Sequence, residues 1–350
     1  MSEMAINQTL PNVTGIRSSA RKLLMSGGAL CVVMVIFWFI ARYFHLQALR
    51  DYPVSTFLAF TLLFAPYWFF GFGAGDALRR ILRSPAVRVL AAALLTLPYF
   101  VLALPRGDFH WPLAATLVAI AVLSAAALAR WQTPGNWADL AVLAVAGLSI
   151  DLGLLNTAGP LAIHGATLWP AGLGGFPKMM MANVALYCYL VIKPIDGVGY
   201  DLAPRFSDVK IGLRELLFYA PIVLTLGLLL KFIAFHHAAD NVALAVPAAW
   251  IFTFIFVALP EELFFRGLVQ NLLERRLGRT GSLLLASVLF GLSHFNKGAH
   301  FNWRYVLLAT IAGIFYGRAW RGQKRLFASS ITHSSVDTIW SIWFRVSQAF

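Results

Sequence analysis

Charged residues are scarce in this chain. Only 12% of its 350 residues are Asp, Glu, Lys or Arg, whereas 59% are hydrophobic. A soluble domain carries about a quarter charged residues, so the composition excludes an ordinary soluble protein. Cysteine is nearly lacking as well, because Cys31 and Cys188 are the only two, and both lie inside apolar runs. This excludes a disulfide framework and a cysteine-based metal site.

The sequence instead contains many long apolar runs. They recur at roughly 17 to 22 residues, the length with which a helix crosses about 30 Å of hydrocarbon. Lipid offers no hydrogen-bond partner, so a spanning backbone must be a helix or a closed barrel, and the runs lack the alternation of barrel strands. We therefore expect an all-α, polytopic transmembrane helical bundle of about 11 spans. The expected spans are 26–44, 54–73, 86–104, 111–129, 137–155, 178–194, 214–235, 243–265, 281–297, 303–320 and 326–346.

The net charge of +13 does not indicate a nucleic-acid partner. The Lys and Arg residues fall in short loops between apolar runs, as membrane insertion requires, and they do not gather on one soluble face. With the N-terminus inside, most of them lie in inside loops. The pattern predicts a multi-pass protein of the inner (cytoplasmic) membrane with a cytoplasmic N-terminus, and the lipid bilayer as its surroundings.

Polarity along the chain predicts four parts. Residues 1–22 form a polar cytoplasmic tail, and residues 23–194 form an N-terminal transmembrane portion without a motif. Residues 195–213 are the most polar internal stretch, which predicts a linker. Residues 214–346 form a C-terminal transmembrane portion, and most of the ionisable residues within apolar runs lie there. Such residues are costly in lipid and are functional candidates.

The first candidates lie in PEELFFRG, residues 260–267, which follows a strongly apolar run. Glu262 and Arg266 are four residues apart and share one face of a helix, so we expect them to pair. Glu261 is rotated from Glu262 by about 100°. We expect Glu261 to be the unpaired carboxylate and therefore the candidate general base.

Two further motifs follow on later apolar runs. In FGLSH, residues 290–294, Phe290 and His294 are four apart. In HSSVD, residues 333–337, the same spacing separates His333 from Asp337. The carboxylate of Asp337 can accept a hydrogen bond from the imidazole and select its tautomer, or both groups can face one water or ion.

EELFFRG, FGLSH and HSSVD, in this order, resemble the three motifs of the CAAX-protease and bacteriocin-processing family, also called the Abi family. The likeness covers about residues 210–346 and implies an integral-membrane endopeptidase, a hydrolase that performs intramembrane proteolysis. Its substrate would be a peptide or the C-terminal or membrane tail of a protein. Eukaryotic members trim prenylated CAAX tails and carry Asn where this chain has Asp337.

The resemblance also implies roles for the motif residues. Glu261 and His294 would activate the attacking water, while His333 and Asp337 would stabilise the oxyanion or orient the site. The remaining motif residues would support the site structurally, namely Glu262, Arg266 and Phe290.

Two versions of the chemistry stay open. The resemblance favours a glutamate-type enzyme without a metal cofactor. In a metalloprotease-like version, Zn²⁺ would be held by His294, His333 and Glu261, with a position left for water. The sequence lacks the HExxH helix that supplies zinc ligands and base together.

Two other functions compete with proteolysis. A non-proteolytic immunity or scaffold protein of the same fold would bind a peptide in the same place without cleaving it. A proton-coupled transporter is disfavoured, because transporters often have two related halves, whereas the ionisable residues here concentrate in one half of the chain.

Overall fold

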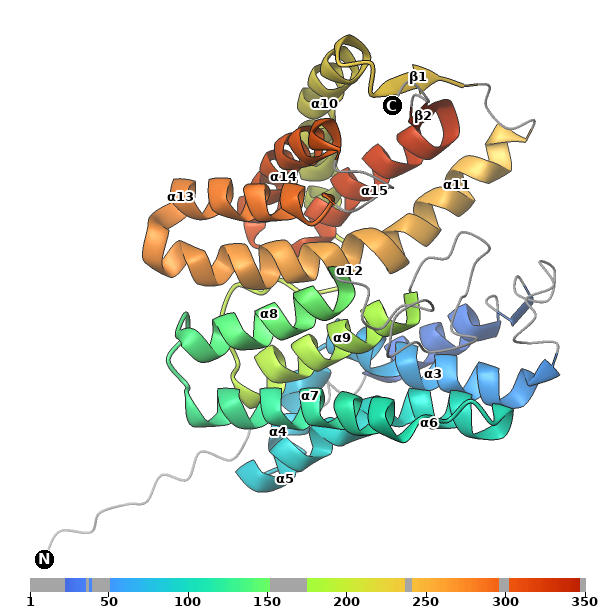
Figure 1. Ribbon diagram of the computed structural model, residues 1–350, viewed down its shortest axis with the longest axis vertical. Helices are drawn as coiled ribbons and strands as arrows, with labels where there is room; N and C mark the ends of the chain where they lie inside the picture. Colours follow the sequence, from blue (N-terminus) through green and yellow to red (C-terminus); the bar gives the residue numbers. More distant parts are fainter. Residues whose placement is uncertain are drawn as a thin grey trace, which may run out of the picture.

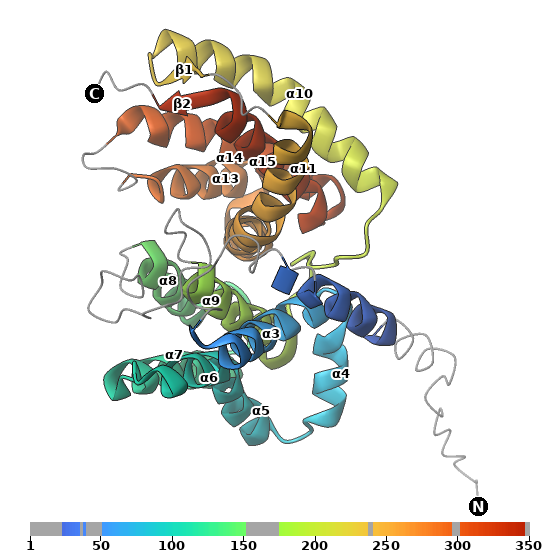
Figure 2. The same ribbon diagram turned by 90° about the vertical axis from the view of Figure 1, so that its right-hand side faces the viewer.

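The computed structural model describes residues 23–35, 38–39, 51–151, 175–236, 241–295 and 302–346. The expected N-terminal tail, residues 1–22, lies outside the described residues. Within them the fold is helical, apart from one small sheet. Figure 1 shows the N-terminal helices (blue to green) as one layer and the C-terminal helices (yellow to red) as a second layer above it, and Figure 2 shows the same division from the side.

The N-terminal layer begins with an apolar helix, Leu23–Val35. Short 3₁₀ turns, η1 and η2, interrupt and end the run 86–104; Pro98 lies two residues after η1, and Pro105 lies within η2. Proline lacks the N–H that an α-helix needs, so this run forms several short helices. The other elements of the layer are α3 (Pro53–Phe70), α4 (Ala74–Ile81), α5 (Pro85–Ala91), η1 (Ala92–Thr96), α6 (Leu97–Ala103), η2 (Leu104–Arg106), α7 (Trp111–Arg130), α8 (Trp137–Asp151), α9 (Gly175–Tyr187) and the π-helical turn η3 (Cys188–Ile192).

The C-terminal layer contains α10 (Phe206–Leu229), which begins inside the stretch 195–213 that the sequence predicts as a linker. A nearly continuous helix follows, and two π-helical segments widen it. The elements after α10 are α11 (Val242–Thr253), η4 (Phe254–Ala258), α12 (Leu259–Glu262), η5 (Leu263–Gln270), α13 (Asn271–Leu292), α14 (Trp303–Gln323) and α15 (Leu326–Trp343).

Five helical stretches of the described part are long and apolar enough to cross a membrane. They are Pro53–Phe70, Pro85–Arg106, Trp111–Arg130, Phe206–Leu229 and Val242–Leu292. The chain is thus an all-α protein of membrane type, but the expectation of about 11 spans is not confirmed. The helices α14 and α15 form where spans are expected, although α14 carries several arginines and α15 is rich in Ser and Thr.

The expected spans 214–235 and 326–346 are wrong at their C-terminal ends. The helix α10 stops at Leu229, and residues Ile233–Phe235 form strand β1. This strand pairs antiparallel with β2 (Phe344–Val346), which follows α15. Strand pairing joins residues far apart in sequence, so local hydrophobicity could not indicate it.

The π-helical turns around the first motif have a local cause. Pro260 has no N–H and its ring clashes with the carbonyl four residues earlier in a regular α-helix, and η4 directly precedes it. With π-type bonding the carbonyl of Ile255 would face Pro260 and would lack a donor. The hydroxyl of Tyr67 on α3 donates to the Ile255 oxygen at 3.2 Å. A hydrogen bond from the N-terminal layer therefore satisfies the widened turn next to Glu261.

Arg325 joins the start of α15 to the start of α10. Its Nε and Nη2 both donate to the carboxylate of Asp208 at 2.8 Å, and its Nη1 donates to Asp201 at 2.5 Å. Burial opposes the charged form of Arg325, but these hydrogen bonds outweigh burial and raise the pKa of Arg325 above its ordinary value. This two-pronged contact aligns α15, which carries the third motif.

Gly278 makes the turn that folds α13 back along the long helix. Its φ of 66° and ψ of −177° lie in a region that only glycine adopts readily. An added Cβ at Gly278 would meet no other atom within 4 Å. Its backbone conformation alone therefore sets the requirement for glycine.

We expect Gly278→Ala to lower the free energy of unfolding by about 1 to 3 kcal/mol, because alanine cannot adopt this conformation without strain. Gly28→Ala is the matched control, since Gly28 is helical and an added Cβ there also meets nothing within 4 Å. It should keep or slightly raise the stability. Denaturant titration in mixed micelles measures both, and equal effects of the two substitutions would refute the conformational explanation.

Candidate active site

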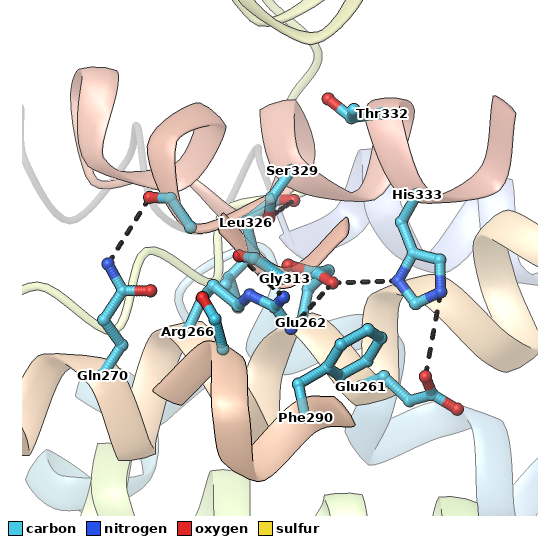
Figure 3. Close-up of polar contacts among 12 residues, drawn as sticks. Glu261, Glu262, Arg266, Gln270, Phe290, Gly313, Leu326, Ser329, Thr332 and His333 are labelled. Atoms are coloured by element: carbon cyan, nitrogen blue, oxygen red, sulfur yellow. Dashed lines mark hydrogen bonds and ion pairs between the residues drawn. The ribbon is translucent and has the colours of Figure 1, made fainter. Parts of the chain in front are cut away.

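A buried ion pair lies at the centre of the three motifs. Arg266 Nη1 is 3.2 Å from Glu262 Oε1, and both side chains are almost completely buried. The expected pairing four residues apart is therefore confirmed. Arg266 also donates to the carbonyl oxygen of Gly313 on α14 at 3.2 Å. Figure 3 shows this arginine beside Glu262, below α15.

Aromatic rings surround the guanidinium of Arg266. Its central carbon lies 4.5 Å from the ring centroid of Phe290 and 5.3 Å from that of Tyr316. Cations are stabilised over such ring faces. Phe290, on α13, thus brings the second motif into contact with the first.

His333 on α15 contacts the same carboxylate as Arg266. Its Nδ1 is 2.9 Å from Glu262 Oε1, and its ring stacks on Tyr316 at a centroid distance of 4.5 Å. A carboxylate only accepts, so Nδ1 carries a proton. The sequence analysis did not anticipate this contact, because it joins residues 71 positions apart.

The other nitrogen of His333 faces two further carboxylates. Its Nε2 is 3.5 Å from Asp337 Oδ2 and 3.8 Å from Glu261 Oε2. The proximity of His333 and Asp337, expected from their spacing, is confirmed. Asp337 is the most exposed of these acids, with 39% of its side chain accessible. Both ring nitrogens of His333 therefore lie near carboxylate oxygens.

Glu261 is not the unpaired carboxylate that the sequence predicts. Its Oε1 lies 2.5 Å from Nζ of Lys178, and 19% of the Glu261 side chain and 23% of the Lys178 side chain are exposed. The expectation was wrong because helical spacing reports only neighbours on the same helix, whereas Lys178 lies on α9 of the N-terminal layer.

The sequence did contain a signal for Lys178. Ionisable residues inside apolar runs are functional candidates, and Lys178 begins the expected span 178–194. A lysine at the edge of a span can also extend to the membrane surface, so its position in the sequence alone does not distinguish the two environments.

His294 lies in the turn directly after α13. Its Nδ1 is 2.9 Å from the carbonyl oxygen of Phe290, and a carbonyl oxygen only accepts, so Nδ1 carries a proton. Its ring packs against Phe290 and against Tyr305, both at centroid distances of 4.9 Å. The ring of Phe290 in turn lies 5.7 Å from the ring of His333, measured between centroids. The three motifs therefore meet in one region.

Within the described residues, no three His, Cys, Asp or Glu side chains are grouped as metal ligands. The three side chains expected to hold zinc, His294, His333 and Glu261, lie within the described residues. In addition, a basic group, Lys178, occupies one oxygen of Glu261.

A double-mutant cycle tests the central ion pair. Arg266→Met should lower the free energy of unfolding by about 3 to 5 kcal/mol, because it removes the guanidinium from the buried Glu262 carboxylate and leaves His333 as its remaining partner. Adding Glu262→Leu should restore most of that loss. Arg205→Met is the matched control, since Arg205 has the same spacing from Asp201 in an exposed pair, and it should cost about 1 kcal/mol or less. A double variant no more stable than the single one would contradict this account.

A known protein family matches part of this chain, and it is the kind of family that the three motifs indicate. Residues 243–339 match the family described as Rce1-like type II CAAX prenyl endopeptidase, and this range includes all three motifs. Searches among curated proteins and among solved structures find no match. Residues 243–339 are therefore similar to the Rce1-like type II CAAX prenyl endopeptidase family, in agreement with the resemblance that the three motifs indicate.

Proposed function

We propose that this protein is an intramembrane endopeptidase of the glutamate type that cleaves a peptide or the C-terminal or membrane tail of a protein. The observation that carries the proposal is the meeting of Glu261, His333 and Asp337 at one partly exposed position inside an otherwise apolar bundle. The family of residues 243–339 supports the same reaction class.

Glu261 is the general base of this proposal. The gap of 3.8 Å between its Oε2 and His333 Nε2 exceeds a direct hydrogen bond, and one water beside that line can contact both atoms. Glu261 takes a proton from this water, and the resulting hydroxide forms a bond to the carbonyl carbon of the substrate. We assign His294, whose ring packs against Phe290, to help Glu261 to activate this water.

His333 stabilises the negative charge that then develops on the carbonyl oxygen. Its Nδ1 proton is held by Glu262, so its Nε2 proton is the one that can point to the substrate. Asp337, 3.5 Å from Nε2, orients the ring. When the C–N bond breaks, Glu261 returns its proton to the leaving amine, and the products are a new carboxylate end and a new amine end.

Arg266, Glu262 and Phe290 support the site without touching the substrate. Arg266 lies between Glu262 and the ring of Phe290, and this contact keeps Glu262 in place for His333. Residues 214–346 form the catalytic part in this proposal, residues 23–194 form the N-terminal transmembrane portion, and residues 195–213 link them. The protein belongs in the cytoplasmic membrane with its N-terminus inside.

Comparative peptidomics tests the reaction. Cells that produce the intact chain should contain a cleavage product that is reduced at least about 100-fold with Glu261→Ala, because the general base contributes a factor of this size. Glu274→Ala is the matched control, since Glu274 also pairs with a lysine at 2.5 Å with similar exposure. A product that persists with Glu261→Ala would contradict the proposal and favour the non-proteolytic immunity or scaffold function.

Metal removal tests the glutamate type. We expect the purified protein to keep its activity after treatment with a strong zinc chelator, because the base and the oxyanion donor are side chains of the protein. Elemental analysis of the active protein should find less than about one zinc per ten chains. A loss of activity that added Zn²⁺ reverses would instead support the zinc version.

A further inference from the structure

Lys178 of the N-terminal layer contacts the carboxylate that the proposed reaction uses as its base. We infer that Lys178 is a positioning residue of this site, and that the N-terminal layer thereby completes a catalytic centre whose motifs all lie in residues 243–339. The inference deepens the proposed function and rests on it for the role of Glu261.

The balance of charge is the first argument. Three carboxylates, Glu261, Glu262 and Asp337, adjoin His333. Within the C-terminal layer, Arg266 and a protonated His333 supply two positive charges against these three negative ones. Partly buried charges are stable only when they are paired. Lys178 supplies the third positive charge, so the cluster becomes neutral while Glu261 stays ionised.

The geometry of Glu261 is the second argument. The ammonium binds Oε1 at 2.5 Å, whereas Oε2 faces His333. One oxygen is therefore anchored and the other is directed toward the place of the proposed water. Without the anchor, rotation of the side chain would allow either oxygen to leave that position.

The placement of α9 is the third argument, because a positioning residue must itself be held. Phe176 and Met179, on either side of Lys178, are completely buried. The ring of Phe176 packs against Phe60 of α3 at a centroid distance of 5.4 Å. The side chain of Asn183 donates to the carbonyl oxygen of Leu63 at 2.8 Å. The helix that carries Lys178 is thus fixed to α3.

The two layers are in turn held together beside Glu261. Tyr67 of α3 donates to the Ile255 oxygen in η4, and an added Cβ at Gly147 of α8 would come within 2.8 Å of the Phe264 ring. Close backbone approach at Gly147 lets the layers meet. Lys178 therefore reaches Glu261 from a fixed support and not from a free loop.

Infrared titration of the full-length protein in lipid nanodiscs tests the inference without a substrate. Subtracting the spectrum of Glu261→Gln isolates the carboxyl band of Glu261. Lys178→Met should move the midpoint of that titration upward by at least about one pH unit, because the carboxylate loses an adjacent positive charge. Other titratable groups also act on Glu261. They are His333 on α15, which contacts Asp337, and His294 after α13, and they are the same in both proteins.

Three variants complete the test. Lys178→Gln also removes the charge and should move the midpoint as Lys178→Met does, which provides a second result if one variant folds poorly. Lys178→Arg keeps the charge and should leave the midpoint near that of the unsubstituted protein. Lys324→Met removes a lysine–glutamate pair of the same length far from Glu261 in sequence and should leave the midpoint unchanged. A midpoint that Lys178→Met and Lys178→Gln leave unchanged would overturn the inference.

Activity separates this inference from the function on which it rests. With the peptide that peptidomics identifies, Lys178→Met should lower kcat at least about tenfold and change KM little, because the base is affected more than binding. An increase in kcat would show an inhibitory contact and overturn the positioning role. If Glu261→Ala stayed active, the proposed function would fail, whereas the infrared result would still decide whether Lys178 holds Glu261 ionised.

Discussion

Placing several carboxylates inside an apolar helical bundle is the constraint that governs this structure. A buried charge without a partner is costly, and a pair is retained only when its geometry is good. Glu262 meets this constraint with Arg266 and His333, and Glu261 meets it with Lys178. Each partner comes from a different helix or turn, so the packing of the bundle and the charge state of the site depend on each other.

Local periodicity predicted much of the site. The spacing of four residues placed Glu262 with Arg266 and His333 with Asp337, and both pairs are present. It could not predict contacts between helices. The bond from His333 to Glu262 and the pair of Lys178 with Glu261 both depend on how distant segments pack, and a pattern within one helix carries no such information.

For the fold as well, local sequence features predict some elements but not those that depend on distant contacts. Hydrophobic runs indicated an all-α membrane protein, and Pro260 explains the π-helical turn before the first motif. The two strands at 233–235 and 344–346 were expected to be helical, because nothing local distinguishes them from the ends of apolar helices. Composition alone could not give the number of spans, because α15 forms where a span is expected but is rich in buried Ser and Thr, which lower its hydropathy.

The central claim is that peptide bonds are cleaved between Glu261 and His333. A cryo-electron microscopy structure of the Glu261→Gln protein with its uncleaved substrate tests this claim most directly. The account predicts that the scissile carbonyl oxygen lies within about 3 Å of His333 Nε2, and that its carbon faces residue 261 across the space of one water. A substrate that binds with its scissile peptide bond away from Glu261 and His333 would contradict this claim.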